Sequence, residues 1–358
     1  MSAPIRVLLV APSLDIVGGQ AVQAARLMEE FVKMPELEIG FLPINPRLPW
    51  PFRPLQQIKF VRTLITEPTY VLMMFWKARQ YDIVHTFGAG YWSFILSATP
   101  AILSGWLWNK KTILNYRDGQ AEDHLNKWPL AVTIMRLVSE IVPPSGFLVD
   151  VFQKFGLKAR FIYNIVDTAQ YRFRARPNPK PIFFSNRGME PLYNVACTIR
   201  AFAIVQGKYP GATLRLAHDG PLRPELQRLA FEELKLKNVE FLGLVNQQRM
   251  RELYDQSDIY LMSPNIDNMP GSILECFACG LPFVSTGVGG VPYIVDDERT
   301  GLLVPANDHR AMAKQALRLI EEENLATRLT DAGKLECRKY TGTAIANDWK
   351  NLYRSLVP

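Results

Sequence analysis

Runs of branched apolar residues alternate with helical patterns along nearly the whole chain. The first run, Ile5–Ala11, is continuous and branched, as a parallel strand buried on both faces should be. Strands that alternate with helices are typical of βαβ units around a parallel sheet. Further strands are expected in the first half at residues 37–41, 82–85, 111–115, 140–142 and 159–163.

The alternation is interrupted once, at residues 175–181, where ARPNPKP holds three prolines in seven residues and indicates an inter-domain linker. It then restarts at Ile182–Ser185, and further strands are expected at 213–217, 239–242, 259–262, 283–285 and 301–304. A length of 358 residues also suits about two domains.

We therefore predict an α/β protein with two Rossmann-like, doubly wound domains, one over residues 1–170 and one over 171–340. Residues 341–358 form a C-terminal helix, for which packing back on the first domain is one alternative. Such sheets bind ligands at the carboxyl ends of their strands. Two of them facing each other would leave a cleft suited to a two-substrate enzyme.

Composition limits the classes of binding partner and the cellular compartment that we expect for this protein. The chain has 41 Lys and Arg against 34 Asp and Glu, and this excess suits anionic partners such as nucleotides, phosphorylated lipids or an anionic membrane face. No run of five basic residues occurs, so nucleic acid is not expected. Four cysteines and no signal peptide favour a cytoplasmic protein. The C-x-x-C of Cys276 and Cys279 is interpreted as packing rather than as a redox or zinc motif.

The segment 263–280, SPNIDNMPGSILECFACG, carries the most chemistry. It follows an expected strand, and Asn268 or Ser272 is available to cap the helix that comes next. Unpaired N–H groups at that helix start form an anion site suited to a diphosphate. Glu275, one turn in, and Asp267 on the loop could accept hydrogen bonds from ribose or sugar hydroxyls. The alternative is that Glu275 only completes a capping arrangement.

Asp267-x7-Glu275, with NMPGS between the acids and ACGLP after them, resembles the acidic signature of glycosyltransferase family 4. FVSTGVGG at 283–290 and TGLLVP at 300–305 continue the resemblance, which implies a GT-B fold and retaining sugar transfer from a nucleotide donor. It implies that Glu275 binds the ribose and that Asp267 contacts the donor sugar, although Asp replaces the usual Glu there. The same resemblance assigns donor binding to Asn268, Met269, Gly271 and Ser272.

The resemblance also implies a phosphate clamp. Arg187, in SNRGMEPLYNV, corresponds to the family arginine that neutralises the leaving diphosphate. The family usually has a lysine about five residues later, but Leu192, Tyr193 and Asn194 supply no cation here. Gly18 and Gly19 resemble the family's N-terminal glycine loop, where backbone amides approach a phosphate or sugar. In His218-Asp219-Gly220-Pro221, a histidine stands where the family turn has a glycine.

The acceptor side is expected in the first domain. In YRDGQAEDHL at 116–125, Arg117 or Asp118 occupies the slot where many family members have a histidine near the transferred sugar. Arg117 could hold a phosphate, and Asp118 could assist proton removal from the acceptor. His85, at a strand end, matches a family histidine that faces the cleft, with a satisfied strand-end histidine as the alternative.

Together these features predict a retaining hexosyltransferase-type enzyme (EC 2.4). It would move a sugar from a nucleoside-diphosphate sugar to a glycan or polyprenyl-linked acceptor, in surface polysaccharide or glycoconjugate synthesis. No cofactor and no metal are expected, since no D-x-D follows a strand and His and Cys are few. The alternatives are a GT-B nucleotide-sugar epimerase and a non-catalytic nucleotide-sugar-binding protein.

Peripheral contact with a membrane is a further expectation. Aromatic and aliphatic residues interleave with Lys and Arg at 50–53 (WPFR), 59–62 (KFVR) and 70–79 (YVLMMFWKAR). A helix of this kind would lie among lipid headgroups at the cytosolic face. The alternative is a helix packed on the sheet. The uncharged segment 91–108 is interpreted as buried or interfacial, because Pro100 lies in its middle.

Overall fold

The chain forms two compact units. The structure, a computed structural model, describes residues 3–15, 18–47 and 61–357. Unit 1 comprises Met1–Ile165 and Gly342–Pro358, and unit 2 comprises Val166–Thr341. The chain passes between them at 165/166 and 341/342, where the sequence analysis placed the boundaries at 170/171 and 340/341. Residues 341–358 were predicted as a C-terminal helix separate from both domains, and all of them except Thr341 belong to unit 1.

Unit 1 is built on a five-stranded parallel sheet in the order β2-β1-β3-β4-β5. Its strands are β1 (Ile5–Ala11), β2 (Leu37–Pro43), β3 (Ile83–Gly88), β4 (Lys111–Tyr116) and β5 (Glu140–Ile141). The strand expected at 159–163 is wrong: Ala159 makes only an isolated bridge to Ile141. The strand order reverses between β1 and β3, which neighbour each other in the sheet.

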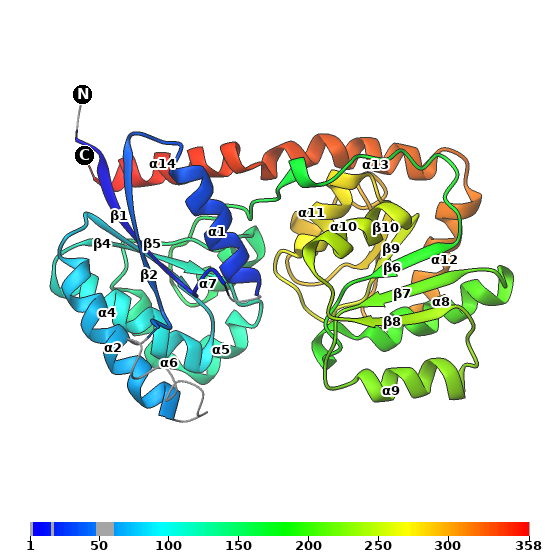
Figure 1. Cartoon of the computed structure of the whole chain (residues 1–358), viewed down its shortest axis with the longest axis horizontal. Helices are drawn as coiled ribbons and strands as arrows, with labels where there is room; N and C mark the ends of the chain where they lie inside the picture. Colours follow the sequence, from blue (N-terminus) through cyan, green and yellow to red (C-terminus); the bar gives the residue numbers. More distant parts are fainter. Residues whose placement is uncertain (1–2, 16–17, 48–60, 358) are drawn as a thin grey trace. The chain divides into compact units, whose positions relative to one another are not determined.

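Helices cover both faces of this sheet (Figure 1). They are α1 (Gly19–Phe31), α2 (Val61–Ala78), α3 (Tyr91–Ser93), α4 (Thr99–Leu107), α5 (Ala121–Lys127), α6 (Pro129–Met135), α7 (Gly146–Lys154) and α14 (Gly342–Leu356). On one face, Phe31 of α1 packs with Trp349 and Tyr353 of α14 over β1 and β3. On the other, Tyr70 of α2 and Ala101 of α4 pack against β1.

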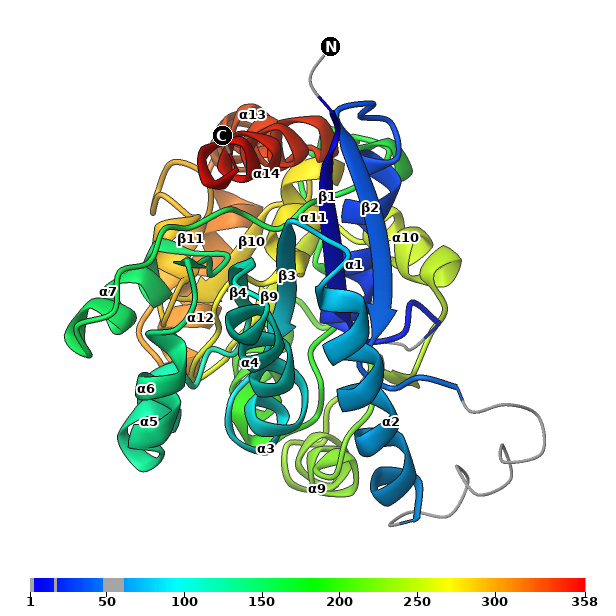
Figure 2. The same ribbon diagram turned by 90° about the vertical axis from the view of Figure 1, so that its left-hand side faces the viewer.

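The uncharged segment 91–108 is a broken helix beside α2 (Figure 2). It consists of α3, the π-helical turn η2 (Phe94–Ala98) and α4. Phe94, Ala98 and Ile102 point into the core of unit 1. Among the described helices, none combines the length and apolar character that crossing a membrane requires.

Unit 2 is built on a six-stranded parallel sheet in the order β11-β10-β9-β6-β7-β8. Its strands are β6 (Ile182–Ser185), β7 (Thr213–Ala217), β8 (Val239–Gly243), β9 (Ile259–Met262), β10 (Phe283–Thr286) and β11 (Leu302–Val304). The chain runs outward from β6 to β8 and then returns to place β9 beside β6. The carboxyl ends of β6 and β9 therefore flank a topological switch point, the usual ligand position in an open α/β sheet.

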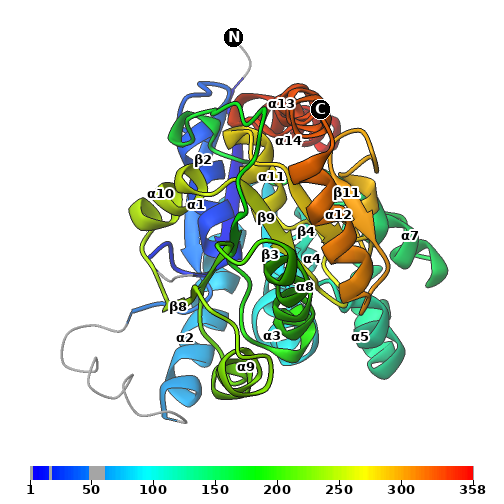
Figure 3. The ribbon, with the colours of Figure 1, turned by 90° about the vertical axis from the view of Figure 1, so that its right-hand side faces the viewer.

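The helices of unit 2 are seen in Figure 3. They are α8 (Val195–Lys208), α9 (Arg223–Arg228), the π-helical turn η5 (Leu229–Glu233), α10 (Gln247–Gln256), α11 (Gly271–Cys279), α12 (His309–Glu321) and α13 (Leu325–Glu336). Short 3-10 turns are η3 (Thr168–Gln170), η4 (Pro191–Tyr193), η6 (Val291–Tyr293) and η7 (Cys337–Tyr340). Successive residues of β6 face opposite sides: Phe183 packs on Phe202 of α8, and Phe184 packs on Tyr254 of α10.

The proline-rich segment 175–181 was predicted to be a linker, but its start is fastened to unit 2. The Arg176 side chain is buried and donates hydrogen bonds to the carbonyl oxygens of Tyr254 at 2.8 Å and Gly280 at 2.7 Å. Arg174 forms an ion pair with Asp258 at 2.6 Å. Because these arginines bind backbone and carboxylate groups, this segment belongs to the fold of unit 2.

Candidate functional site

The residues predicted to bind the donor gather at the switch point of unit 2. Asn186 and Arg187 directly follow β6, and the loop 263–270 directly follows β9. Helix α11 begins where this loop ends. Because β6 and β9 are paired neighbours, their carboxyl ends bring these segments together.

Arg187 and Asp267 form a largely buried ion pair. Arg187 Nη2 donates to Asp267 Oδ2, and the two side chains are only 13% and 14% exposed. Burial acts to lower the pKa of the Arg187 guanidinium, but Asp267 and the nearby tyrosines outweigh burial and raise that pKa. The structure thus brings together two residues that lie 80 positions apart and were predicted separately.

Tyr193 occupies the region where the sequence comparison expects a lysine. Its ring lies under the Arg187 guanidinium, 4.4 Å from the ring centroid to the guanidinium carbon. The next residue, Asn194, precedes α8 in the left-handed backbone conformation. The residue that stands in place of the missing lysine therefore has a structural role, because the Tyr193 ring makes a cation–π contact with Arg187.

The loop 263–270, which we call the donor loop, is held by the end of β10 and by the glycine-containing loop that follows it. Gly290 N–H donates to the Asp267 carbonyl oxygen at 2.8 Å, and Thr286 Oγ1 donates to the Pro264 carbonyl oxygen at 2.6 Å. A Cβ atom on Gly290 would lie 1.7 Å from the Asn268 carbonyl oxygen. Glycine is therefore required here for close approach of two backbones, which explains the motif at 283–290.

The start of α11 is open, but it is not capped as predicted. Pro270 is the residue at the cap position and its side chain makes no capping hydrogen bond, so neither Asn268 nor Ser272 stands at the N-cap position expected for them. The Ser272 hydroxyl instead lies 3.7 Å from Met262 Sδ. A Cβ atom on Gly271 would meet no atom within 4 Å, so there is open space beside the first helical residue.

Glu275 takes part in a partly buried network that sequence reasoning missed. Tyr254 Oη donates to Glu275 Oε2 at 2.7 Å and accepts from Asn186 Nδ2 at 3.0 Å. Tyr260 Oη donates to Asn186 Oδ1 at 2.6 Å. These bonds account for one carboxylate oxygen of Glu275, so its roles in binding a donor or completing a helix cap both stay predictions. No sequence pattern marks Tyr254 or Tyr260, and Asn186 is signalled only by its position beside Arg187.

His218 stands at the end of β7 with a φ of +93°. This left-handed region favours glycine, which agrees with the glycine of the turn that the segment resembles. Its Nδ1 lies 3.3 Å from the Asp219 carbonyl oxygen, and the side chain is exposed. Non-glycine residues in such conformations are often found at functional sites.

In unit 1, Gly18 and Gly19 open helix α1 after β1. A Cβ atom on either glycine would meet nothing within 4 Å among the described residues. Gly18 has a φ of 177°, an extended conformation that any residue adopts. Packing within unit 1 therefore does not require glycine at these positions, and a role in ligand approach stays a prediction.

Arg117 directly follows β4 and carries a partly desolvated charge. Its Nε donates to Asn115 Oδ1 at 3.0 Å, and its Nη1 donates to Asn164 Oδ1. The guanidinium carbon lies 4.7 Å from the ring centroid of Phe87. Burial lowers the pKa of Arg117 to about 9. Among the described residues it has no carboxylate partner, so its charge is suited to an external anion, as the sequence suggested.

His85 was expected to face a cleft, and this expectation is wrong. The side chain is fully buried. Asn115 donates to Nε2 at 3.0 Å, and Nδ1 lies 2.7 Å from Tyr353 Oη. The ring also stacks on Trp349 at 4.3 Å between centroids. Burial, and secondarily Arg117, lower the pKa of His85 to about 3. The residue is a satisfied interior histidine, neutral at physiological pH.

Asp118 is engaged by the backbone of two loops, its own and the loop after β3. Its Oδ2 accepts from Gly90 N–H at 3.0 Å, and its Oδ1 accepts from Gln120 N–H at 2.9 Å. Both carboxylate oxygens are therefore held by the backbone, and the role of Asp118 in proton removal stays a prediction. Nearby, His124 Nδ1 lies 2.9 Å from Tyr116 Oη. His124 is fully buried, and burial lowers its pKa.

Nothing in residues 3–15, 18–47 and 61–357 groups three metal-binding side chains. The four cysteines are buried and free, and burial raises the pKa of each thiol. Cys276 and Cys279 lie inside α11. Metal independence itself stays a prediction.

Comparison with known proteins shows that the chain is similar to glycosyltransferases. Residues 179–322 match the model of the family described as Glycosyl transferases group 1. LpsE of Rhizobium meliloti (strain 1021), a lipopolysaccharide core biosynthesis glycosyltransferase, is 26% identical over 242 residues, which are 65% of this chain and 69% of LpsE. An N-acetylgalactosaminyltransferase of Campylobacter jejuni, whose name specifies an undecaprenol-linked glycan, is 27% identical over 138 residues, 38% of this chain and 37% of that protein.

Among solved structures, HepE of Anabaena in complex with UDP and glucose superposes with a TM-score of 0.76. It is 16% identical, and the match covers 98% of this chain and 100% of HepE. The chain therefore has a GT-B fold, and most of its C-terminal unit, residues 179–322, is similar to glycosyl transferases group 1. The matches span between about a quarter and about two thirds of the lengths of the curated relatives.

Proposed function

We propose that this protein is a retaining glycosyltransferase that uses a nucleoside-diphosphate sugar. The observation that carries the proposal is the cluster at the switch point of unit 2. There the Arg187–Asp267 pair lies with Glu275 and with the open start of α11. A cation, an open helix N-terminus and two carboxylates are the groups that a diphosphate and sugar or ribose hydroxyls need.

The residues would divide the work as follows. The donor's diphosphate would lie at the first N–H groups of α11, and Arg187 would neutralise the charge that develops on it as the bond to the sugar breaks. The acceptor would attack from the same face, so no carboxylate nucleophile is required. Asp267 and Glu275 would then bind hydroxyl groups rather than act as a hydrolytic acid and base pair.

The ion pair adds a restraint on the donor sugar. Asp267 has a shorter side chain than the usual glutamate, and one of its oxygens accepts from Arg187 while the other accepts from the Asn268 N–H at 2.8 Å. A donor hydroxyl would therefore meet a carboxylate of fixed orientation. This arrangement favours selection among sugars by hydroxyl position.

A glycan or lipid-linked acceptor in glycoconjugate or polysaccharide synthesis completes the proposal. LpsE and the Campylobacter enzyme support it, because their names specify a lipopolysaccharide core and an undecaprenol-linked glycan. A lipid-linked acceptor would bring the enzyme to the cytosolic face of a membrane. Arg117, with its desolvated charge, is our candidate in unit 1 for an anionic group of the substrates.

The test begins with binding of UDP-, GDP- and ADP-sugars to the purified chain, measured by thermal shift. Glu275→Ala should weaken binding of the preferred donor roughly 10- to 100-fold, because a hydrogen bond to a charged group is lost. Glu321→Ala is the matched control. Glu321 is also a glutamate of unit 2 that accepts a tyrosine hydrogen bond, but it lies on α12.

Product analysis then separates the alternatives. Sugar transfer or donor hydrolysis with retained anomeric configuration, seen by proton NMR, would support the proposal. A changed sugar stereocentre on an intact nucleotide sugar would identify an epimerase, and binding without any turnover would identify a non-catalytic binder. Unchanged donor binding by folded Glu275→Ala protein would remove Glu275 from the site.

A further inference from the structure

Helix α2 is apolar on both of its faces. Thr66, Tyr70, Met74 and Ala78 form the buried row that packs on the sheet. On the outward side, Leu64, Leu72 and Trp76 are 75%, 61% and 53% exposed, and Val71 is exposed as well. An ordinary surface helix carries polar residues on its outward face. The outward row of α2 is therefore more apolar than is usual for a helix face exposed to solvent.

The neighbouring helix repeats the pattern. Ala101, Ile102 and Gly105 of α4 are buried, whereas Leu103 and Leu107 are exposed, Leu107 at 59%. The two helices lie side by side in Figure 2. Trp108 Nε1 donates to the Phe75 carbonyl oxygen at 2.7 Å, which joins their C-terminal ends.

We call this combined surface the α2–α4 face: Leu64, Val71, Leu72 and Trp76 with Leu103 and Leu107. A groove of about 510 Å³ runs between the helices. It is lined by Glu67, Pro68, Val71, Leu72, Ile95, Leu96 and Pro100. Burial raises the pKa of Glu67, the one ionisable residue in this lining. A contiguous apolar surface with a groove marks a site of interaction.

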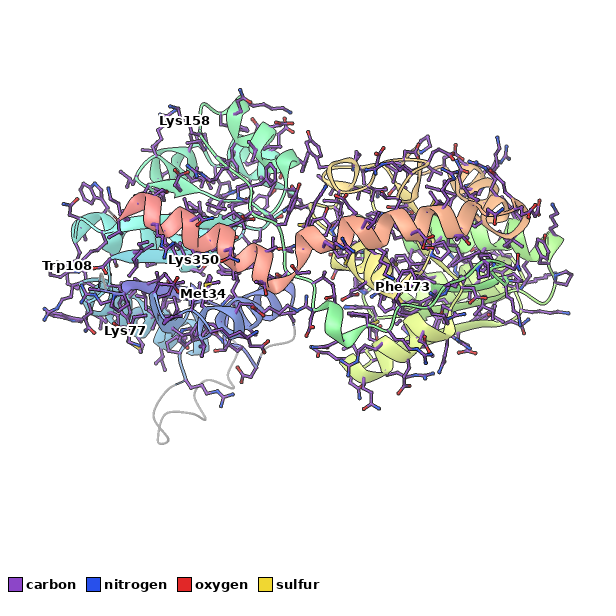
Figure 4. All side chains as sticks on the ribbon, turned by 90° about the horizontal axis from the view of Figure 1, so that it is seen from above. Met34, Lys77, Trp108, Lys158, Phe173 and Lys350 are labelled. Carbon is purple, nitrogen blue, oxygen red and sulfur yellow. The ribbon has the colours of Figure 1, made fainter. Side chains whose placement is uncertain are left out.

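Basic residues flank the end of this face where α2 and α4 finish. Lys77 and Arg79 follow Trp76, and the Arg79 guanidinium carbon lies 5.2 Å from the centroid of the Trp76 ring. Lys110 and Lys111 follow α4. Figure 4 shows Lys77 and Trp108 at the same outer edge of unit 1. Leucines and a tryptophan beside lysine and arginine match the composition of helices that lie among lipid headgroups.

We infer that the α2–α4 face docks on a lipid bilayer that contains anionic lipids. The apolar row would enter the boundary between headgroups and acyl chains, and the four cations would meet lipid phosphates. A second copy of this chain fits less well, because the lining of the groove offers those cations one acidic side chain, Glu67. The inference deepens the proposed lipid-linked acceptor, but docking can be measured without any sugar transfer. Of the aromatic and basic residues predicted to touch a membrane, 50–53 and 59–60 lie outside the described residues.

The experiment is co-sedimentation of the full chain with phosphatidylcholine vesicles, with and without phosphatidylglycerol, at low and high salt. Wild type should pellet with the anionic vesicles at low salt. Leu72→Gln with Trp76→Gln should lower the partition coefficient on the order of tenfold per side chain. Lys77→Gln with Arg79→Gln should lower it on anionic vesicles only. Phe231→Gln with Leu244→Gln, two exposed apolar residues of unit 2, is the control and should pellet as wild type.

Wild type that stays in the supernatant with anionic vesicles at low salt would overturn the inference. So would a wild-type dimer, seen by sedimentation velocity, that Leu72→Gln with Trp76→Gln converts to monomer. Donor binding by the same folded variants should equal that of wild type. If donor binding is absent throughout while the vesicles still pellet the protein, the proposed function fails and the docking surface stands.

Discussion

Tyr254 Oη donates a 2.7 Å hydrogen bond to Glu275 Oε2, from helix α10 to helix α11. The tyrosine is fully buried, and its hydroxyl also accepts from Asn186, which precedes Arg187 in the chain. A fully buried group thus sets the orientation of the carboxylate predicted to bind the donor's ribose. It belongs to the same network that borders Arg187, the arginine predicted to bind phosphate.

Tyr254→Phe should weaken donor binding while the protein stays folded. Loss of the hydroxyl frees the Glu275 carboxylate to rotate, at a cost of about 1–2 kcal/mol, or about five- to thirtyfold in Kd. Kd is measured by calorimetry for the preferred nucleotide and for its 2′-deoxy form. The variant should discriminate less between the two, which a purely structural defect would not cause.

Tyr209→Phe is the control for this variant, because Tyr209 makes a comparable 3.0 Å hydrogen bond to Glu321 on the surface of unit 2. It should bind donor as wild type does. Equal discrimination between ribose and deoxyribose in wild type and Tyr254→Phe would show that Tyr254 does not orient the binding carboxylate.

Gly290→Ala should disrupt the donor loop. Its new methyl group would lie 1.7 Å from the Asn268 carbonyl oxygen, so the loop must move. We expect the free energy of unfolding to fall by about 1–3 kcal/mol, as for other overpacked sites, and donor binding to weaken. Gly287→Ala, in the same loop, would meet its nearest atom at 3.6 Å and should be tolerated in both assays. Equal behaviour of the two variants would contradict the steric explanation.

Sugar transfer is expected to continue without a divalent metal. Arg187 and the start of α11 would carry the charge of the leaving diphosphate, and the described residues include no cluster of three metal-binding side chains. Activity is measured after dialysis against EDTA and compared with untreated enzyme. Complete loss that manganese or magnesium restores would refute this account of leaving-group stabilisation.

Acid should destabilise the protein through His85. Burial lowers the pKa of His85 to about 3 in the folded protein, whereas an unfolded histidine titrates near 6.5. Between these values the unfolded chain binds a proton that the folded chain does not. The free energy of unfolding should therefore fall as pH decreases across this window, by up to about 1.4 kcal/mol per pH unit.

Urea unfolding at a series of pH values measures this effect. His85→Gln should be less stable at neutral pH but should show a shallower pH dependence. Tyr353→Phe removes the hydrogen bond to Nδ1 and keeps the titrating imidazole, so it should lose stability and keep the wild-type slope. Equal slopes for wild type and His85→Gln would disprove the assignment.

Much of the fold follows from local patterns. The expected strand at 37–41 forms as Leu37–Pro43, and the helix expected after Asp267 and Asn268 forms as Gly271–Cys279. The strand expected at 159–163 does not form. Ile162 is buried in the core, but Phe161 is exposed, and the segment makes an isolated bridge to Ile141 rather than a continuous ladder. Periodicity reports which residues are buried, but it does not report which backbone groups find a partner.

The donor loop was predictable for the same reason. Asp267 and Glu275 lie within one short segment, and a strand, a loop and a helix N-terminus follow one another there. By contrast, the supports of the site come from distant positions. Tyr254 and Asn186 reach Glu275 from α10 and from the end of β6, and nothing in their local sequence marks them.

By itself, then, the sequence determined the alternation of strands and helices, the two α/β domains and the acidic donor loop, since each depends on residues close together in the chain. Only the tertiary structure decided that His85 is an interior residue, because its partner Tyr353 lies 268 positions away in α14. It also decided that α2 and α4 share an apolar face that the described residues leave exposed. A pattern of apolar residues predicts burial against something, and only long-range packing determines which rows the protein itself covers.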